Sequence, residues 1–393
     1  MRGAFIVGYA RTPIGRLLGG LSAVTAMDLG GVAIRAALDR AGVPPDRVDQ
    51  VVMGHVLQAG QGQITARQAA RAAGIGMATP AVTVNKVCLS GSTAVHLADL
   101  AIRAGEHEVV VAGGMESMSR APHLLPRARS GYRTGDGVLV DAMLDDGLRD
   151  PFDDAHMGAV ADRTNERHGI SRARQDEWAA MSHERAASAW KDGRFPAETV
   201  PVRVPGPGGD ILVVDADEGI RPGVTPESLS RLRPAFTPAG TVTAGNASQV
   251  SDGAAAMVLA GSRAVARMGL TPLGRVLSFA TVAGPDNTLH HQPAEACRRA
   301  AARIDVPPDG LDLYEINEAF AAVAIRSADL LGVGADRVNV NGGAVALGHP
   351  IGCSGTRVTV TLLAELRRRG GGRGAAALCG GGGQGDALIV EAL

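Results

Sequence analysis

Short apolar runs alternate with stretches of helical periodicity in the first part of the chain. The runs "AFIVGYA", "QVVMGHV" and "EVVVAGGM" have the composition of buried strands. Between them, apolar residues recur at helical spacing in "ITARQAARAAG" and in "AMDLGGVAIRAALDRAG". We expect the second of these helices to begin near Thr25 and to end at Gly42. This alternation predicts a mostly parallel sheet with helices on its faces.

The pattern changes between about Ser119 and Asn246. Turn residues and charges dominate "RAPHLLPRARSGYRTGDGVLVDAMLDDG", and one long helical run follows in "SRARQDEWAAMSHERAASAWKDG". The next segment, "VPVRVPGPGGDILVVDADEGIRPG", is rich in Pro and Gly. We interpret residues 119–246 as an inserted loop domain, which serves either as a stabilising lid or as part of a ligand site.

The α/β alternation returns with "DGAAAMVLA", and the second half of the chain then resembles the first. Each half has Val-Asn, then Ser-Gly, then a helical run, then an apolar strand that ends in glycines. Ser90-Gly91 corresponds to Ser354-Gly355. We therefore predict an α/β protein with a duplicated domain. Residues 1–118 with 247–270 form the first copy, and residues 271–393 form the second.

Composition narrows the class of protein. Hydrophobic residues make up 45% of the 393 residues but aromatic residues only 3%, so the core is built from Ala, Val, Leu and Ile. Lys and Arg (39) balance Asp and Glu (40) and are interspersed with them, which predicts no nucleic-acid partner. We expect no membrane span, because no apolar run reaches the ~18 residues that one needs. The N-terminal "MRGAFIVGYARTP" is interpreted as a first strand and not as a signal peptide.

The four cysteines lie far apart and form no Cys-x-x-Cys pair. This spacing predicts neither a zinc site nor a disulfide framework, and it favours a reducing, cytoplasmic compartment. We assign Cys297 and Cys353 to packing or to the surface.

Cys88 stands at the start of a predicted helix, in "VNKVCLSGSTAVHLADLAI". A thiol at this position faces unpaired N–H groups and the positive end of the helix dipole, and both favour the nucleophilic thiolate. The ordinary alternative is a buried cysteine that packs as a small apolar side chain.

Three further residues stand in sequence contexts that suit chemistry. His349 lies in the Gly/Pro frame "NGGAVALGHPIGCSG", which predicts an immobilised imidazole at a strand-to-helix turn. Cys379 precedes four glycines in "AALCGGGGQGDA", where no side chain shields the thiol or the backbone N–H groups from a substrate carbonyl. Asn317, in "YEINEAF", is by itself an ordinary capping residue.

Taken together, these motifs resemble the thiolase family. "VNKVCLSG", "GNASQVSDGAA", "NEAFA", "GGAVALGHPIGCSG" and "LCGGGGQG" occur in the family's order and at similar spacing, and the resemblance covers essentially the whole chain. The segment "HLLPRARSGYRTGDGVLVDAMLDDGL" is most similar to the biosynthetic type, the acetyl-CoA acetyltransferases. The resemblance implies duplicated α/β thiolase-like domains in a five-layer α-β-α-β-α arrangement with an inserted loop domain.

The resemblance also implies the reaction and the roles of single residues. The reaction is a reversible Claisen condensation of two acetyl-CoA molecules through an acyl-cysteine. Cys88 would be the nucleophile, His349 its base, and Cys379 the acid/base for the α-proton. Asn317 would hold the water of one oxyanion hole, and the N–H groups of Cys88 and Gly381 would form the other. Predicted coenzyme A contacts are Leu148, His156, Met157, Arg221, Phe236, Ser248, Ala319 and Phe320. No metal or permanently bound cofactor is implied, only coenzyme A thioesters as substrates.

One segment departs from the family, and it keeps an alternative open. "TLHHQPAEA" (Thr288 to Ala296) stands where biosynthetic thiolases often have Met-Gly-x-Gly-Pro. A 3-ketoacyl-CoA thiolase that acts on longer chains is therefore the alternative function. A ketoacyl synthase is disfavoured, because "YEINEAF" lacks that class's second histidine.

Two further expectations concern regulation and assembly. A rival from another class is a redox protein with a switchable Cys88–Cys379 disulfide. The resemblance implies a homodimer or homotetramer, with the loop from about Arg127 to Val140 as a tetramer contact.

Overall fold

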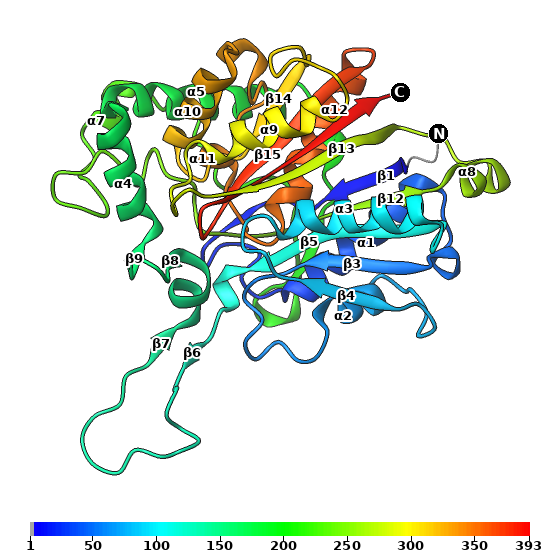
Figure 1. The fold of residues 1–393 in the computed structure, drawn as a ribbon. Helices are drawn as coiled ribbons and strands as arrows, with labels where there is room; N and C mark the ends of the chain where they lie inside the picture. Colours follow the sequence, from blue (N-terminus) through cyan, green and yellow to red (C-terminus); the bar gives the residue numbers. More distant parts are fainter. Residues whose placement is uncertain (1–3) are drawn as a thin grey trace.

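A mixed sheet of ten strands forms the centre of the computed structural model, which describes residues 4–393 (Figure 1). Residues 1–3 of the predicted first domain lie outside the described residues. Five main strands come from the first half: β1 (Phe5–Arg11), β3 (Gln50–Gly54), β4 (Ala81–Val84), β5 (Val109–Ser117) and β12 (Ser251–Ala260). Four come from the second half: β13 (Gly274–Ala283), β14 (Leu313–Ile316), β15 (Gly372–Gly380) and β16 (Gln384–Ala392). The short strand β2 (Gly15–Arg16) pairs with β12.

The prediction of a mostly parallel sheet is wrong. Within residues 4–393, β3 pairs in parallel with β4 and β5, and β14 with β15, while the other strand pairs of the sheet are antiparallel. The β–α alternation predicts the relative direction only of strands that are joined through a helix. β15 and β16 are instead joined by a tight glycine turn, and β12 reaches the sheet after the long insertion. The two halves also share one sheet, because β1 pairs with β13 at Phe5 and Ile6.

The helices and the two halves of the sheet form five layers, as the family resemblance implies. Helices α1 (Ala26–Ala41) and α2 (Thr65–Ala72) cover one face of the N-terminal strands, and α9 (Gln292–Ala302) and α10 (Ala321–Leu331) cover the C-terminal strands. Helices α3 (Ser90–Ala104) and α12 (Ser354–Arg368) lie between the two halves. The α1 boundaries match the prediction, with Thr25 as N-cap and Gly42 as C-cap at a φ of 66°.

The repeated Ser-Gly pairs mark the point where α3 and α12 touch. A Cβ atom on Gly91 would lie 2.7 Å from the backbone nitrogen of Thr356, and one on Gly355 would lie 2.2 Å from that of Ser92. Only glycine permits two helices to meet this closely through their backbones. The first turns of both helices are therefore held side by side, with Cys88 and His349 just before them.

The insertion is built from a long arm, two long helices and short elements. The segment between β6 (His123–Leu124) and β7 (Val140–Asp141) projects far from the body of the molecule (Figure 1). Its other helices and strands are the π-helix Leu144–Leu148, β8 (Arg149–Asp150), β9 (Ala155–His156), α4 (Met157–His168), α5 (Arg172–Lys191), α6 (Arg194–Glu198), β10 (Val202–Pro205), β11 (Ile211–Val214) and α7 (Pro226–Ser230). The insertion also contains the 3-10 turn Pro207–Gly209, and the turn Met118–Arg120 lies at its start. Elsewhere lie α8 (Ser262–Met268), α11 (Ala344–Leu347) and the 3-10 turns Pro45–Arg47 and Ala335–Arg337.

A buried carboxylate, Glu318, anchors the insertion to the second half. Its Oε1 accepts hydrogen bonds from the Trp178 indole (2.8 Å) and the Asn339 amide (2.9 Å). Its Oε2 accepts from Ser182 (2.8 Å) and from the backbone N–H of Val345 (3.0 Å). Because both oxygens are fully used, the glutamate of "NEAF" is a structural residue that ties α5 to the loop leading to His349.

No helix within residues 4–393 combines the length and the apolar character needed to cross a bilayer.

Candidate active site

Cys88 lies in a tight turn between β4 and α3. The residue before it, Val87, has a φ of 49°, a left-handed conformation that β-branched residues rarely adopt. Ser90 Oγ accepts a hydrogen bond from the backbone N–H of Lys86 (2.8 Å) and donates one to the carbonyl of Val87 (2.6 Å). The turn places the thiol just before the first turn of α3, as the sequence predicts.

The expectation that the helix start makes Cys88 acidic is wrong for the protein without substrate. Burial raises the pKa of the thiol to about 11 and outweighs the backbone N–H groups of Gly381 and Cys88, which lower it. A buried thiolate loses its hydration, and the few donors at the turn do not replace it. The thiol is therefore protonated at neutral pH and needs a base.

This pKa predicts how Cys88 reacts with alkylating agents. Alkylation of the free protein by iodoacetamide is expected to accelerate about tenfold per unit between about pH 7 and pH 10, because the thiolate fraction grows in proportion below the pKa. Peptide mapping by mass spectrometry follows Cys88 separately from the other thiols. A rate that levels off near about pH 8 would show an ordinary thiol.

His349 is buried between α11 and α12, and its ring is held from two sides. Its Nδ1 lies 2.6 Å from Ser354 Oγ, which itself donates to the carbonyl of Pro350 at 3.0 Å. Since the hydroxyl proton goes to Pro350, Nδ1 carries the ring proton and Nε2 keeps a lone pair. Burial lowers the pKa of His349 to about 3, with a further contribution from Arg357. The imidazole is thus neutral and suited to accept a proton at Nε2.

Asn317 follows β14 and reaches the same ring. Its side-chain Nδ2 lies 3.4 Å from His349 Nε2, and its backbone N–H donates to the carbonyl of Ala377 at 2.9 Å. Its Oδ1 is buried and has no hydrogen-bond partner within residues 4–393. A buried amide oxygen of this kind can accept a hydrogen bond from a water or from a substrate group.

Cys379 is the last residue but one of β15 and is fully buried beside a glycine turn. Burial raises the pKa of its thiol, and the neighbouring Cys88 raises it further. The next residue, Gly380, packs on Leu89 so closely that a Cβ would lie 2.5 Å from Leu89 Cγ. The backbone N–H of Gly381 faces the Cys88 sulfur. The two thiols and the N–H groups therefore converge although they come from distant parts of the chain.

One narrow cavity of about 60 Å³ joins these groups. It brings together nine of the thirteen predicted site residues: Cys88, Leu148, Met157, Ser248, Ala319, Phe320, His349, Cys379 and Gly381. Asn317 adjoins it through His349. A cavity of this size suits a small group.

The remaining predicted residues lie outside this cavity. His156 stacks on Phe236 with ring centroids 4.6 Å apart, and Phe236 meets the edge of Phe320 at 6.3 Å. The rings of His156 and Phe236 therefore extend the aromatic lining of the cavity beyond Phe320. Arg221 is exposed, and its backbone N–H donates to His183 Nδ1 at 3.1 Å.

Several residues that line the cavity were not predicted from the sequence. Val87, Gly147, Leu289, Ile351 and Gly380 also line the cavity. Leu289 gave a signal, because it lies in the one segment that departs from the family pattern. Ser354, which selects the ring tautomer of His349, was part of a quoted motif but gave no chemical signal.

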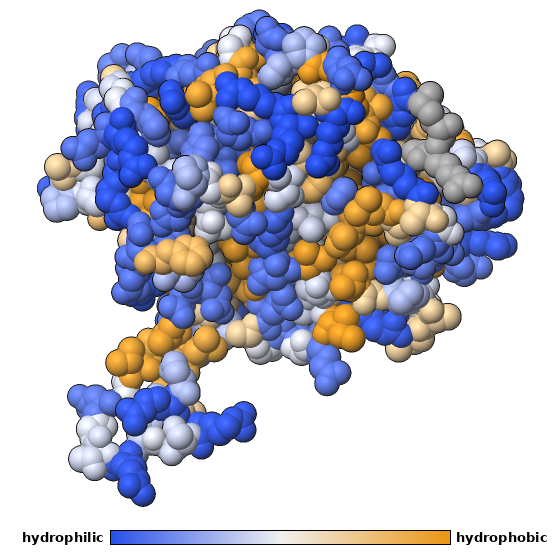
Figure 2. Space-filling model, in the orientation of Figure 1, coloured by the Kyte–Doolittle hydropathy of each residue, from blue (hydrophilic) through white to orange (hydrophobic). Residues whose placement is uncertain are grey.

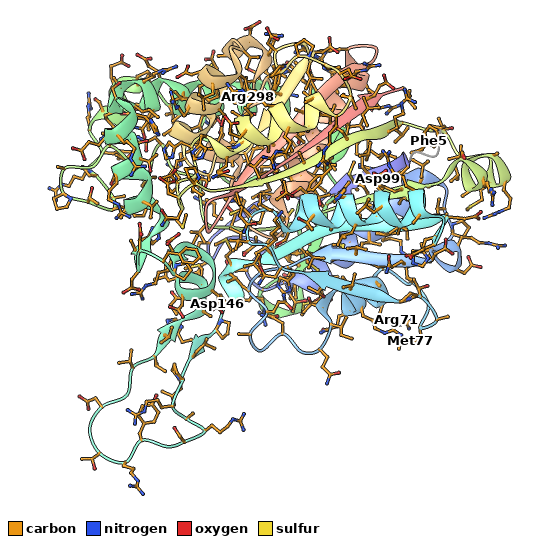
Figure 3. The ribbon with its side chains drawn as sticks, viewed as in Figure 1. Phe5, Arg71, Met77, Asp99, Asp146 and Arg298 are labelled. Carbon is orange, nitrogen blue, oxygen red and sulfur yellow. The ribbon has the colours of Figure 1, made fainter. Side chains whose placement is uncertain are left out.

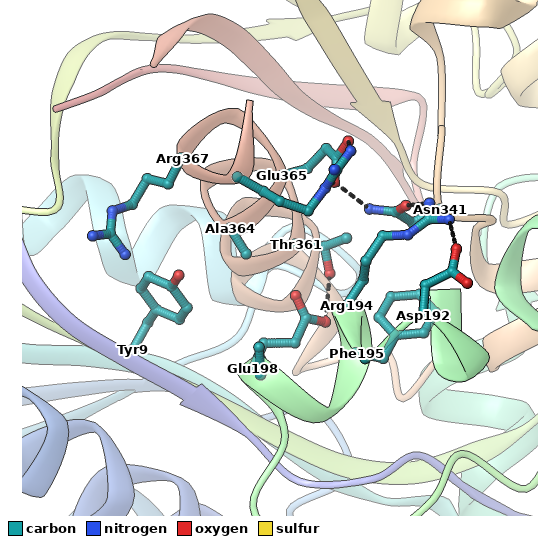
Figure 4. Close-up of a pocket in the computed structure, with 13 residues that line it drawn as sticks. Tyr9, Asp192, Arg194, Phe195, Glu198, Asn341, Thr361, Ala364, Glu365 and Arg367 are labelled. Carbon is teal, nitrogen blue, oxygen red and sulfur yellow. Dashed lines mark hydrogen bonds and ion pairs between the residues drawn. The ribbon is translucent and has the colours of Figure 1, made fainter. Parts of the chain in front are cut away.

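A second cavity, of about 380 Å³, lies among side chains of the insertion and α12, many of them charged, with Tyr9 of β1 on one side (Figure 4). None of its lining residues is Cys or His. Its charges pair with one another: Arg194 binds Asp192, Arg368 binds Glu365 at 2.6 Å, and Thr361 donates to Glu198 at 3.0 Å. The smaller cavity with the thiols is therefore the candidate active site.

The arrangement in the smaller cavity suits nucleophilic acyl transfer. A thiol, a neutral imidazole and two backbone N–H donors are the groups needed to form a thioester through a tetrahedral oxyanion. A second thiol beside them is placed to act as an acid or base on a bound acyl group.

Comparison with known proteins agrees with this chemistry. Residues 4–263 match the family model described as "Thiolase, N-terminal domain", and residues 270–392 match "Thiolase, C-terminal domain". The chain is 54% identical to a "Probable acetyl-CoA acetyltransferase" of Mycobacterium tuberculosis and 50% identical to an "Acetyl-CoA acetyltransferase" of Cupriavidus necator, with 100% of both chains covered in each case.

A solved structure confirms the predicted fold. The "Crystal structure of the Bacillus anthracis acetyl-CoA acetyltransferase" superposes with a TM-score of 0.97 at 40% identity, over 100% of this chain and 99% of that one. With both family models matched and full-length relatives at this level of identity, the chain belongs to the thiolase family.

Proposed function

We propose that this chain is an acyltransferase that condenses two acetyl-CoA molecules, reversibly, to acetoacetyl-CoA and free CoA through an acyl-Cys88 intermediate. The observation that carries this proposal is the shared cavity of Cys88, His349, Cys379 and Gly381. The names of the full-length relatives support the same substrate.

The first half-reaction forms the acyl-enzyme. His349 Nε2 takes the proton of the Cys88 thiol, and the thiolate attacks the carbonyl carbon of acetyl-CoA. The N–H groups of Cys88 and Gly381 bind the oxyanion, and CoA leaves with the proton from His349. Losing one such donor typically costs about 2.7–4 kcal/mol of barrier.

The second half-reaction forms the carbon–carbon bond. His349 Nε2 takes the proton of the Cys379 thiol, and the resulting thiolate removes a proton from the methyl group of a second acetyl-CoA, while the Nε2–H of His349 and the water held by Asn317 bind the enolate oxygen. The enolate carbon attacks the acyl group on Cys88, and the departing Cys88 thiolate takes the proton from His349, which restores both resting groups. The methyl group of a thioester is a weak carbon acid, so its deprotonation needs fixed hydrogen-bond donors in place of water around the enolate oxygen.

The same residues outline the coenzyme A site that we propose. Leu148, Met157, Ser248, Ala319 and Phe320 line the cavity, where they would contact the pantetheine chain. The stacked rings of His156 and Phe236 continue this wall outward. The exposed guanidinium of Arg221 would meet the more polar end of the coenzyme. We propose no permanently bound cofactor.

The cavity favours acetyl over longer acyl groups. Its volume is about 60 Å³, and its lining includes the apolar side chains of Leu289 and Ile351, which are not among the proposed pantetheine contacts. Leu289 is 4% exposed and packs in the same cluster as Cys379. A longer acyl chain would have to displace these side chains, so the 3-ketoacyl-CoA alternative is not favoured.

Shortening Leu289 is expected to change the preferred substrate. Leu289→Ala should raise kcat/KM for 3-ketohexanoyl-CoA relative to acetoacetyl-CoA by about tenfold, because each methylene in an apolar pocket is worth about 1–3 kcal/mol. Thiolysis assays with both substrates measure the ratio. The matched control is Leu311→Ala, a buried leucine of the core around α9 and α10. It should lower stability similarly, by about 2–5 kcal/mol, without changing the ratio. An unchanged ratio in Leu289→Ala would contradict this role.

We also propose a homodimer or homotetramer in the cytoplasm. β4 is an edge strand with Val82 41% exposed, and Leu97 and Leu100 of α3 are exposed beside it; Figure 2 shows apolar atoms gathered on this face. Exposed Leu125, Val138 and Leu139 lie at the base of the long arm, which would make the tetramer contact. The four cysteines are free, which suits a reducing compartment. The proposed domains remain 1–118 with 247–270, 119–246 and 271–393.

Incubation with acetyl-CoA tests the function. We expect an acetyl group on the Cys88 peptide, which mass spectrometry detects. We also expect release of CoA and formation of acetoacetyl-CoA, which absorbance measures. If neither the Cys88 adduct nor acetoacetyl-CoA forms, the proposed function is rejected.

A further inference from the structure

A buried carboxylate on β16 binds the chain on both sides of Cys88. Asp386 is fully buried, and its Oδ1 lies 2.7 Å from Lys86 Nζ and 2.8 Å from Thr281 Oγ1. Its Oδ2 accepts hydrogen bonds from Ser92 (3.0 Å) and Thr93 (3.1 Å). We call these five residues the Asp386 clamp. Lys86 precedes the nucleophile by two residues, and Ser92 and Thr93 follow it in the first turn of α3.

The segment that the clamp holds is strained. Val87, between Lys86 and Cys88, keeps its left-handed φ of 49° although it is β-branched. A residue in such a conformation persists only when its surroundings fix the backbone on both sides. Asp386 supplies that constraint. Its carboxylate pairs with Lys86 before Cys88 and accepts the hydroxyl hydrogen bonds of Ser92 and Thr93 after it.

The clamp also joins this segment to the hairpin of Cys379. Asp386 lies opposite Leu378 in the β15–β16 pairing, and the next pair is Cys379 with Gly385. Gly381 follows in the turn, with its N–H facing the Cys88 sulfur. Asp386 therefore links the turn that carries Cys88 to the hairpin that carries Gly381. None of the clamp residues lines the cavity.

We propose that Lys86 and Asp386 are positioning residues that set the oxyanion hole formed by the N–H groups of Cys88 and Gly381. The inference rests on the proposed function, since the hole serves the acylation of Cys88. Loss of the clamp charges would let the Val87 turn relax and would move the Cys88 sulfur away from the Gly381 N–H. Misplacement by about 1 Å can cost a reaction on the order of 100-fold.

The test compares two reactions in the same protein. Asp386→Asn and Lys86→Met are each expected to slow acylation of Cys88 by acetyl-CoA about 100-fold, measured in single turnovers by intact mass. The second reaction is solvent deuterium exchange into the methyl group of acetyl-CoA, which Cys379 carries out with His349 and Asn317. It is measured in Cys88→Ala with and without Asp386→Asn. Because it does not use the Cys88–Gly381 hole, it should stay within about threefold.

Matched variants separate positioning from general damage. Lys86→Arg keeps the charge and should recover most of the acylation rate. Arg103→Met removes a comparable ion pair farther along α3, where Arg103 Nε lies 2.7 Å from Asp99, and should leave acylation unchanged. Asp99 is labelled on α3 in Figure 3.

Each outcome bears on the proposal. Slow acylation with intact exchange supports it. Acylation within about threefold of wild type in both clamp variants overturns it, and so does a parallel fall of acylation and exchange, which would indicate a purely structural role. If the wild-type protein itself shows neither acylation nor exchange, the proposed function fails, and this inference fails with it.

Discussion

Replacing Cys88 by serine is expected to reduce turnover by about 10⁴-fold or more and to abolish the covalent acetyl adduct, as for other nucleophile knock-outs. The hydroxyl of serine is a far weaker acid than a thiol, so the neutral imidazole of His349 cannot generate an equivalent nucleophile in this buried site. The measurement is steady-state thiolysis of acetoacetyl-CoA, together with retention of radiolabelled acetyl-CoA on the denatured protein.

A buried cysteine away from the site provides the control. Cys297 is fully buried in the core around α9 and α10. Cys297→Ala should lower stability somewhat while keeping the acetyl adduct and most of the turnover. If the Cys88→Ser protein retains the label at the wild-type level, Cys88 is not the acyl carrier.

Replacing Cys379 by alanine is expected to separate the two half-reactions. Acetylation of Cys88 should continue at a rate close to wild type, while condensation falls by about 10²–10⁴-fold, the usual contribution of a positioned acid or base. The reason is that Cys379 is buried beside Cys88 but supplies no donor to the first oxyanion. Intact mass spectrometry detects the adduct, and acetoacetyl-CoA formation reports condensation.

The matching control is Cys353→Ala, the buried cysteine at the start of α12. Cys353 does not line the cavity, so the Cys353→Ala protein should carry out both half-reactions. A Cys379→Ala protein that carries no acetyl group on Cys88, yet remains folded, would refute the division of labour between the two thiols.

Local patterns predicted many single elements and most of the site. The α1 boundaries follow from Thr25 and Gly42, because capping chemistry depends on neighbours in the sequence. Cys88, His349 and Cys379 were recognised from their glycine-rich contexts and from the resemblance, and they meet in one cavity. Strand directions were not predicted, because the glycine turn between β15 and β16 and the return of β12 depend on how distant segments pair.

The acidity of the nucleophile could not be derived from its position alone. A helix start favours the thiolate, but burial raises the pKa of Cys88 to about 11, and burial results from packing by residues far away in the sequence. The ion pair of Lys86 and Asp386 could not be derived from the sequence either, because the two residues are 300 residues apart. Nothing local marks either residue as part of the site.

The sequence by itself thus determined the family of the chain and the candidate residues for its chemistry, since both depend on residue types at fixed spacing along the chain. Only the tertiary structure decided the protonation states of Cys88 and His349, the size of the cavity beside the thiols and the contacts of Asp386 with the chain on both sides of Cys88. Each of these depends on desolvation and contact between side chains that folding brings together, and neither quantity is encoded in any single stretch of the chain.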